Sequence, residues 1–146
     1  MQTFLPYADF FESVKVLDKK RCWKQVVEAK QIISCLCETQ TRWINHPAVK
    51  MWVGYESLLK QYFNIFLKYC LEVHKINTKM QPYDIPLDDN QTIPFWLGNE
   101  NFHRAMRSRL IAKDKNFYLP KFPKDENFND SKYFWPVMET QSFRII

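Results

Sequence analysis

The chain has 146 residues, a net charge of +5 and only two glycines, Gly54 and Gly98. This length suits one domain with one sizeable core. Two isolated glycines exclude the glycine-rich loops that bind ATP phosphates or nicotinamide dinucleotides, and the excess of basic residues favours an anionic partner such as nucleic acid.

Residues 1–6 form a short, largely apolar segment that ends at Pro6, which predicts an N-terminus tucked into the body of the protein. Initiator methionine is generally removed only before small residues. Because Gln2 follows it, we expect Met1 to be retained with a free α-amine. The residues up to Thr3 bring no charged region of the kind that begins a signal peptide, so no signal peptide is expected.

Two helices are predicted next. A short helix over residues 9–16 is capped by Asp9, and a longer amphipathic helix over residues 17–37 has Asp18 as its N-cap. Apolar residues recur on one face of the longer helix: Cys22, Val26, Ala29, Ile33 and Leu36. Another side carries the polar residues Arg21, Lys24, Gln25, Glu28 and Gln31. Glu28, one acid among bases, is first of all typical of a solvated helix face, and it also suits an acid/base centre in a nucleic-acid groove.

The longest run of helical periodicity covers residues 47–74, where a broad apolar stripe predicts a central, buried helix. Pro47 suits its first turn. Gly54 either allows a close helix–helix approach or marks a break. Residues 75–98 form a connection, because their prolines and their Asp and Asn residues rule out a continuous helix.

A third principal helix is capped by Asn99 or Asn101 and reaches about Ala112. From Lys115 onward the chain is rich in proline and aromatic residues. Exposed apolar surface costs about 25 cal/mol per Å², so this tail is expected to wrap the helices. No strand alternation is convincing. The predicted fold is all-α, a single domain over residues 1–146 with three principal helices, a short N-terminal helix and a wrapped, aromatic-rich irregular C-terminal tail.

The spacing of cysteines and histidines favours neither a metal site nor a disulfide framework. The cysteines, none in a Cys-x-x-Cys pair, are Cys22, Cys35, Cys37 and Cys70. The widely separated histidines are His46, His74 and His103. We therefore expect a cytosolic protein with reduced, buried thiols and no metal. No apolar run approaches the roughly 18 residues of a membrane span, so none is expected.

The segment over residues 102–115, FHRAMRSRLIAKDK, is strongly basic. Arginine at this density suits phosphate, because its planar fork makes paired hydrogen bonds. A solvated face is the alternative for any basic helix taken alone. Further basic residues on two other predicted helices are Arg21, Lys24 and Lys50. Together they favour a nucleic-acid backbone as the ligand. His46 is either a helix cap or a proton carrier near neutral pH, and Trp52 is expected in the core.

The first long helix carries the pattern Leu17-x4-Cys22-x2-Gln25-x2-Glu28. This spacing resembles the first long helix of the pyrimidine-dimer DNA glycosylases of the phage endonuclease V type. The resemblance continues from Pro47-x6-Gly54 into the aromatic helix that follows, and from residues 103–110 into the aromatic, lysine-containing tail. Most of the chain is also similar to a group of small phage and bacterial proteins placed near that family.

The resemblance implies an all-α enzyme without metal or cofactor. Such an enzyme cuts the N-glycosidic bond at a UV-induced cyclobutane pyrimidine dimer and then breaks the strand at the abasic sugar. The family's nucleophile is the N-terminal α-amine, which forms a Schiff base at C1′ and here belongs to Met1. The family's catalytic glutamate corresponds to Glu28. Where the family commonly carries arginines, this sequence has Val27 and Gln31, which leaves the type of lesion open.

The residue types suit this chemistry. An α-amine has a reference pKa of about 7.7–8.0, so a useful fraction is unprotonated at neutral pH. A carboxylate beside Arg21 and Lys24 is expected to stay ionised and to move protons. The residues assigned to DNA binding are Gln2, Arg21, Lys24, Gln25, His46, Lys50, His103, Arg104, Arg107 and Arg109.

Three hypotheses follow. The leading one is a monomeric DNA glycosylase with abasic-site lyase activity on double-stranded DNA, catalysed by Met1 and Glu28 without a cofactor, in the cytoplasm of a bacterium or a phage-infected host cell. The first alternative is a non-catalytic basic helical module that binds DNA or RNA, in which Glu28 is a solvated residue. The second is a protein–protein adaptor whose aromatic tail is the interface.

Overall fold

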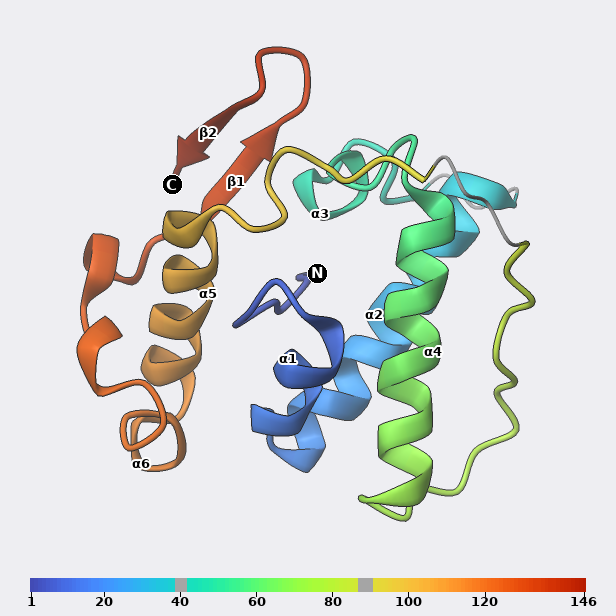
Figure 1. Ribbon diagram of the computed structural model, residues 1–146, viewed down its shortest axis with the longest axis horizontal. Coiled ribbons are helices and arrows are strands. Elements are labelled where there is room, and N and C mark those ends of the chain that lie inside the picture. The colour runs from blue at the N-terminus through green and yellow to red at the C-terminus, as the bar shows by residue number, and fades with distance from the viewer. Residues whose placement is uncertain (39–41, 87–90) are drawn as a thin grey trace. The chain divides into compact units, whose positions relative to one another are not determined.

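The computed structural model describes residues 1–38, 42–86 and 91–146 (Figure 1). The chain forms two compact units. The first consists of Met1–Thr3 and Leu17–Pro94, and the second of Phe4–Val16 and Phe95–Ile146. A single domain for the whole chain stays a prediction. The helices in the described ranges lack the combination of length and hydrophobicity that a membrane-spanning segment needs.

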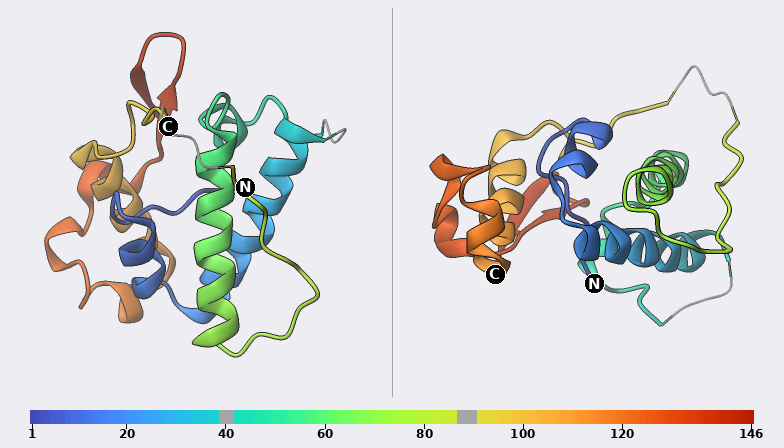
Figure 2. Two further views of the ribbon diagram at one scale, coloured as in Figure 1. Left: turned by 45° about the vertical axis from the view of Figure 1, so that its right-hand side comes forward. Right: turned by 90° about the horizontal axis from the view of Figure 1, so that it is seen from below.

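The core of the first unit lies between α2 (Lys19–Cys37) and α4 (Glu56–Glu72), which run side by side in Figures 1 and 2. The predicted apolar face of α2 is buried except at its end, where Leu36 is half-buried. The thiols of Cys22 and Cys70 meet between the two helices with their Sγ atoms 2.9 Å apart. Both are buried, as predicted, and so is Cys35. Cys37 is exposed, contrary to prediction, because it lies at the very end of α2.

The predicted helix over residues 47–74 is wrong in its first half. The structure has a short helix, α3 (Pro47–Lys50), followed by turns, and α4 begins only at Glu56. Gly54, between the two helices, has a φ of 86°, which is a backbone conformation that favours glycine. An added Cβ on Gly54 would meet no atom within 4 Å. The glycine therefore marks a break and not a close helix–helix approach.

The connection after α4 has no helix over residues 75–86 and 91–94, as predicted; its residues 87–90 lie outside the described part of the chain. Tyr83 connects this segment to α2 and α4 through hydrogen bonds. The Asn64 side chain donates to the Tyr83 carbonyl and accepts from the Tyr83 N–H, each at 2.8 Å. Lys30 Nζ donates to the Tyr83 hydroxyl at 2.7 Å.

The second unit contains α1 (Phe10–Val16) and α5 (Glu100–Lys113). Both helices begin at the N-cap residues that the sequence predicts. Asp9 Oδ1 accepts from the Glu12 N–H at 2.8 Å, and Asn99 Oδ1 accepts from the Phe102 N–H at 3.0 Å.

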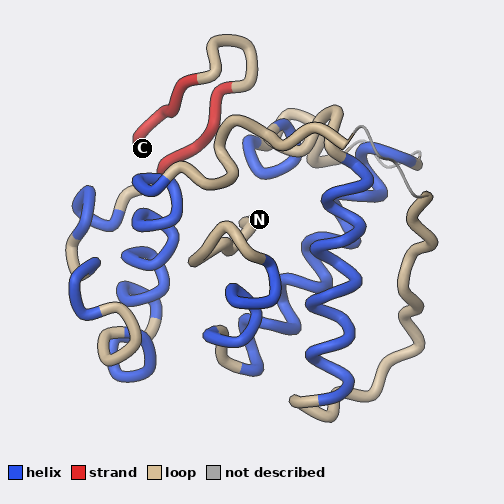
Figure 3. Tube along the Cα trace, in the orientation of Figure 1, coloured by secondary structure: helices blue, strands red, loops and turns tan. Residues whose placement is uncertain are grey.

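The tail of the second unit departs from the prediction of an irregular, strand-free segment. It forms α6 (Lys115–Tyr118) and two short 3-10 turns, and ends in an antiparallel hairpin of β1 (Phe134–Val137) and β2 (Ser142–Ile145), drawn red in Figure 3. The fold is therefore mostly helical and not all-α. The strands have only four residues each and one contains a proline, so period-two alternation is too short to detect. The pairing brings the rings of Phe134 and Phe143 into a stack 4.5 Å apart. α6, both 3-10 turns and β1 contact α5.

Candidate active site at the N-terminus and Glu28

The carboxylate of Glu28 lies in the first unit, on α2, and the N-terminal residues dock on it. Glu28 Oε2 accepts a hydrogen bond from the backbone N–H of Gln2 at 2.9 Å. The Glu28 residue is 8% exposed, so it is not the solvated helix residue that a basic stripe would suggest. Because the Gln2 nitrogen is one residue from the chain end, covalent geometry places the Met1 α-amine within about 7 Å of that oxygen. The two predicted catalytic groups are therefore brought together.

The docking of the N-terminus is fixed by two further hydrogen bonds. The Thr3 N–H donates to Oε1 of Gln2 at 3.1 Å, which orients the Gln2 side chain. The Trp52 indole N–H donates to Thr3 Oγ1 at 3.2 Å. Trp52 is fully buried, which confirms its predicted place in the core, and residues 2–6 are buried, as expected for a tucked N-terminus.

Gln25 lies one turn before Glu28 and donates to the same carboxylate oxygen, with Nε2 at 3.2 Å from Glu28 Oε2. The Oε1 atom of Gln25 accepts from the Tyr62 hydroxyl on α4 at 2.9 Å. The sequence assigned Gln25 and Gln2 to DNA binding. Both side chains are buried, so their observed roles are in the protein's own hydrogen bonds.

His46 caps α3 with its side chain, because Nδ1 accepts from the Ala48 N–H at 3.0 Å. Burial lowers the pKa of His46, and so does the positive charge of the N-terminal amine. The imidazole is therefore near the Met1 amine and neutral at pH 7. The sequence left open whether His46 is a cap or a proton carrier. The structure shows the cap, and proton transfer stays a prediction.

The cations that the sequence places beside Glu28 do not contact its carboxylate through any described hydrogen bond or ion pair. Arg21 NH1 pairs with Asp18 at 3.3 Å, while the Asp18 side chain makes no capping hydrogen bond to α2. Lys24 and Lys50 are exposed. The described hydrogen-bond partners of Glu28 are thus the neutral donors Gln2 and Gln25.

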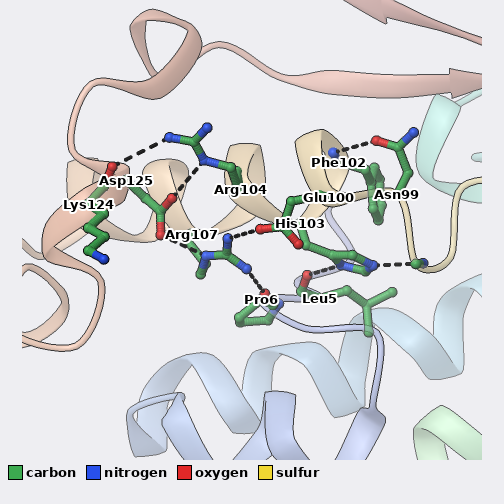
Figure 4. A network of polar contacts seen from close by, with 11 residues as sticks. Leu5, Pro6, Asn99, Glu100, Phe102, His103, Arg104, Arg107, Lys124 and Asp125 are labelled. Atoms are coloured by element: carbon green, nitrogen blue, oxygen red, sulfur yellow. Dashed lines mark hydrogen bonds and ion pairs between the residues drawn. The ribbon is translucent and has the colours of Figure 1, made fainter.

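The basic residues of α5 lie in the second unit, where Figure 4 shows His103 and Arg107 turned to protein atoms. The His103 ring contacts the Leu5 carbonyl at 2.8 Å through Nδ1, and its Nε2 accepts from the Gly98 N–H at 2.9 Å. This pattern fixes the neutral tautomer with its proton on Nδ1. Burial is the main cause that lowers the pKa of His103.

Arg107 uses its guanidinium inside the second unit. It donates at 2.7 Å to each of three acceptors: Asp125 Oδ2, Glu100 Oε1 and the Pro6 carbonyl. Its hydrogen-bonding fork is engaged and its side chain is buried, so the observed role of Arg107 is inside the protein, and contact with phosphate stays a prediction.

Two neighbouring arginines of α5 also bind protein groups. Arg104 Nε donates to Asp125 Oδ1 at 3.0 Å, and its guanidinium lies 4.2 Å from the Phe128 ring centre. Arg109 donates to the Ser131 carbonyl at 2.9 Å. Contact of these side chains with DNA stays a prediction.

Sequence reasoning missed Tyr62 and Thr3 as parts of the site. Tyr62 falls within the broad apolar stripe predicted over residues 47–74, although a buried tyrosine hydroxyl normally has a partner. This requirement could have indicated that Tyr62 makes a buried hydrogen bond, but it does not identify the partner. Over the three described ranges, no group of three or more His, Cys, Asp or Glu side chains could hold a metal ion.

A comparison with protein families places this site in a known context. The family model described as pyrimidine dimer DNA glycosylase matches residues 1–81, which include Met1, Glu28 and Tyr62. No solved structure matches the chain. The match extends over more than half of the sequence and confirms the resemblance seen in the first long helix. The chain belongs to the pyrimidine dimer DNA glycosylase family.

Proposed function

We propose that the protein is a DNA glycosylase with abasic-site lyase activity, acting on damaged or modified bases in double-stranded DNA, with pyrimidine dimers as the expected lesion. Family membership supports a glycosylase that acts on DNA. The observation that carries the mechanism is the hydrogen bond from the Gln2 N–H to Glu28, which holds the chain end beside a buried carboxylate.

The proposed reaction begins at the α-amine of Met1. Its lone pair attacks C1′, and the N-glycosidic bond breaks with its electron pair leaving on the base, which takes up a proton. The ammonium formed at C1′ first passes a proton to the Glu28 carboxylate. Glu28 gives this proton to the ring oxygen as the sugar opens, so that a protonated imine links C1′ to the protein. Glu28 then accepts a proton from C2′, and the C3′–O bond breaks with release of the phosphate. Water finally hydrolyses the imine and frees the amine.

An α-amine is well suited to this step. It deprotonates at a lower pH than a lysine does, so a larger fraction is nucleophilic near neutrality. Nearby His46, neutral for the reasons given above, adds no positive charge to the site.

The burial of Glu28 disfavours the non-catalytic alternative. A solvated helix carboxylate needs no protein donors, whereas this one is enclosed and receives two of them. Burying a carboxylate costs free energy unless hydrogen bonds compensate. An enclosed acid beside the N-terminal residues is the expected arrangement for an acid/base catalyst that works with an N-terminal nucleophile.

Borohydride trapping tests the proposal. The purified protein is incubated with a duplex that carries one abasic site, and borohydride reduces any imine to a stable covalent adduct. We expect an adduct that peptide mapping assigns to Met1. A version with extra residues before Met1 is the matched control and should not trap, whereas the same residues placed after Ile146 should not interfere. No adduct, or an adduct on a lysine, would overturn the proposal.

Glu28→Gln tests the proton-transfer role. It keeps the side-chain shape but removes the proton-accepting group, so we expect strand cleavage at the abasic site to fall by at least about 100-fold. Affinity for the same duplex, measured by fluorescence anisotropy, should stay close to that of the wild type. Glu38→Gln makes the same change at an exposed position and should cleave normally. Full cleavage by Glu28→Gln would remove Glu28 from the mechanism.

A further inference from the structure

A buried chain of hydrogen bonds runs from α4 to the carboxylate of Glu28. The Tyr62 hydroxyl donates to Gln25 Oε1, and Gln25 Nε2 donates to Glu28 Oε2. Tyr62 is 1% exposed and Gln25 is 2% exposed, so water does not compete for these bonds. The Tyr62 ring is itself held in a stack on Phe66, with ring centres 4.0 Å apart.

The chain has a defined polarity. Because the Tyr62 hydroxyl donates to the amide oxygen of Gln25, the amide nitrogen is the atom that faces Glu28. The opposite amide orientation would set the Gln25 oxygen against a carboxylate oxygen, which is repulsive. The carboxylate thus selects the orientation of the Gln25 amide, and the Tyr62 hydroxyl holds the side chain in place by donating to its Oε1.

The two oxygens of Glu28 consequently differ. Oε2 accepts from both Gln25 and the Gln2 N–H. Oε1 has no hydrogen-bond partner among the described residues. One oxygen is therefore anchored by two neutral donors, and the other is left for a reacting group.

We infer that Gln25 and Tyr62 are positioning residues of the proposed reaction: they anchor Glu28 through Oε2, so that Oε1 exchanges the protons of the sugar. This inference rests on the proposed function. Protein donors around a catalytic carboxylate act in this way because a fixed acid or base needs no reorientation during proton transfer. This arrangement could not be predicted from sequence spacing, because Tyr62 is 37 positions from Gln25 in the chain.

Tyr62→Phe tests the inference most directly. It removes the hydroxyl and leaves the ring that stacks on Phe66. We expect the single-turnover rate of strand cleavage on a saturating abasic-site duplex to fall about tenfold, because a less firmly held Glu28 is misplaced relative to the reacting sugar. The dissociation constant for the duplex should not change. Tyr83→Phe, which removes a hydroxyl bonded to Lys30 in the same unit, is the matched control and should cleave at the wild-type rate.

Gln25→Glu provides a readout that a merely structural role would not move. The substitution keeps the shape and still accepts from Tyr62, but it places a second carboxyl group against Glu28 Oε2. Two carboxyl groups at this distance share a proton. We expect the acidic limb of the pH–rate profile to move upward by about one pH unit or more. The profile of Tyr83→Phe should match that of the wild type.

The outcomes separate the inference from the proposed function. If the wild-type protein neither traps nor cleaves abasic DNA, the proposed function is overturned and this inference with it. If the wild type cleaves, but Tyr62→Phe keeps the full rate or Gln25→Glu keeps the wild-type pH profile, the inference alone is overturned. Should one variant fail to fold, as judged by its thermal unfolding, the other decides.

Discussion

The guanidinium of Arg107 binds groups of the protein itself, although it belongs to a helix whose basic residues predict a phosphate-binding surface. Burial works to lower the pKa of Arg107, but its hydrogen bonds with Asp125 and Glu100 outweigh burial and raise it. The side chain is therefore a permanent cation that neutralises buried acid and also holds the Pro6 carbonyl. Its place on a basic helix was visible in the sequence, whereas its partners were not. Glu28 is the converse case, an acid whose described donors are neutral.

Arg107→Lys tests this structural role at the residue scale. Lysine keeps the positive charge but has no planar fork, so it cannot serve the three acceptors together. We expect the free energy of unfolding, measured with urea, to fall by about 2–4 kcal/mol, the loss of two hydrogen bonds to charged or buried groups. Arg144→Lys, at an exposed position, should change stability by less than about 0.5 kcal/mol. Unchanged stability together with weaker DNA binding would instead indicate a phosphate contact.

At the scale of elements, the break between α3 and α4 allows the two helices to contribute different residues to the candidate site. α3 and the turn after it carry His46 and Trp52 beside the N-terminal residues, while α4 supplies Tyr62. One continuous helix would not contain the turns that the structure has over residues 51–54. Apolar periodicity runs through this region without interruption, so periodicity alone could not locate the break.

Gly54→Ala tests whether backbone conformation maintains that break. At a φ of 86° an L-residue is strained, and no neighbouring atom lies within 4 Å of the new Cβ. The cost is therefore conformational, and we expect a loss of about 1–2 kcal/mol in urea unfolding. Gly54→Asn should lose less, because asparagine tolerates a positive φ better. Lys68→Ala, at an exposed site in α4, should have little effect. Equal stability of Gly54→Ala and the wild type would contradict this account.

At the scale of the whole molecule, stability is expected to depend on pH through its histidines. The pKa of each is lowered, mainly by burial. His103 is the most enclosed and is locked as a neutral tautomer between the Leu5 carbonyl and the Gly98 N–H. Below the ordinary histidine pKa of about 6.5, the unfolded chain binds protons that the folded chain resists, so stability falls as the pH falls.

His103→Gln should reduce this dependence. We expect the free energy of unfolding of the wild type to decrease between pH 7 and pH 5, by no more than about 1.4 kcal/mol per pH unit from this one group. The slope should be shallower in His103→Gln, even if the variant is less stable at pH 7. His46→Gln should remove less of the slope, because His46 is only half-buried. An identical slope in the wild type and His103→Gln would exclude His103 as the titrating group.

Sequence alone predicted the helical character of the chain, the capped starts of α1 and α5, the buried face of α2 and Glu28 as the candidate carboxylate. These features repeat at three- and four-residue intervals or lie within one turn, so local spacing is enough to predict them. The family pattern around Glu28 also lies within a single helix. The four-residue strands of the hairpin were too short for the same method.

The groups that meet in the folded protein are far apart in the sequence. The Gln2 N–H reaches Glu28 across 26 positions, Tyr62 reaches Gln25 across 37, and Arg107 reaches the Pro6 carbonyl across 101. Periodicity specifies which face of a helix is buried, but not which distant donor satisfies a buried polar atom on that face. Most buried polar atoms of a folded protein have a partner, and that partner is often distant in the sequence. For this reason the contacts of Glu28 with Gln2 and of Arg107 with Pro6 could not be predicted from the sequence, while the binding of phosphate by Arg107 stays a prediction.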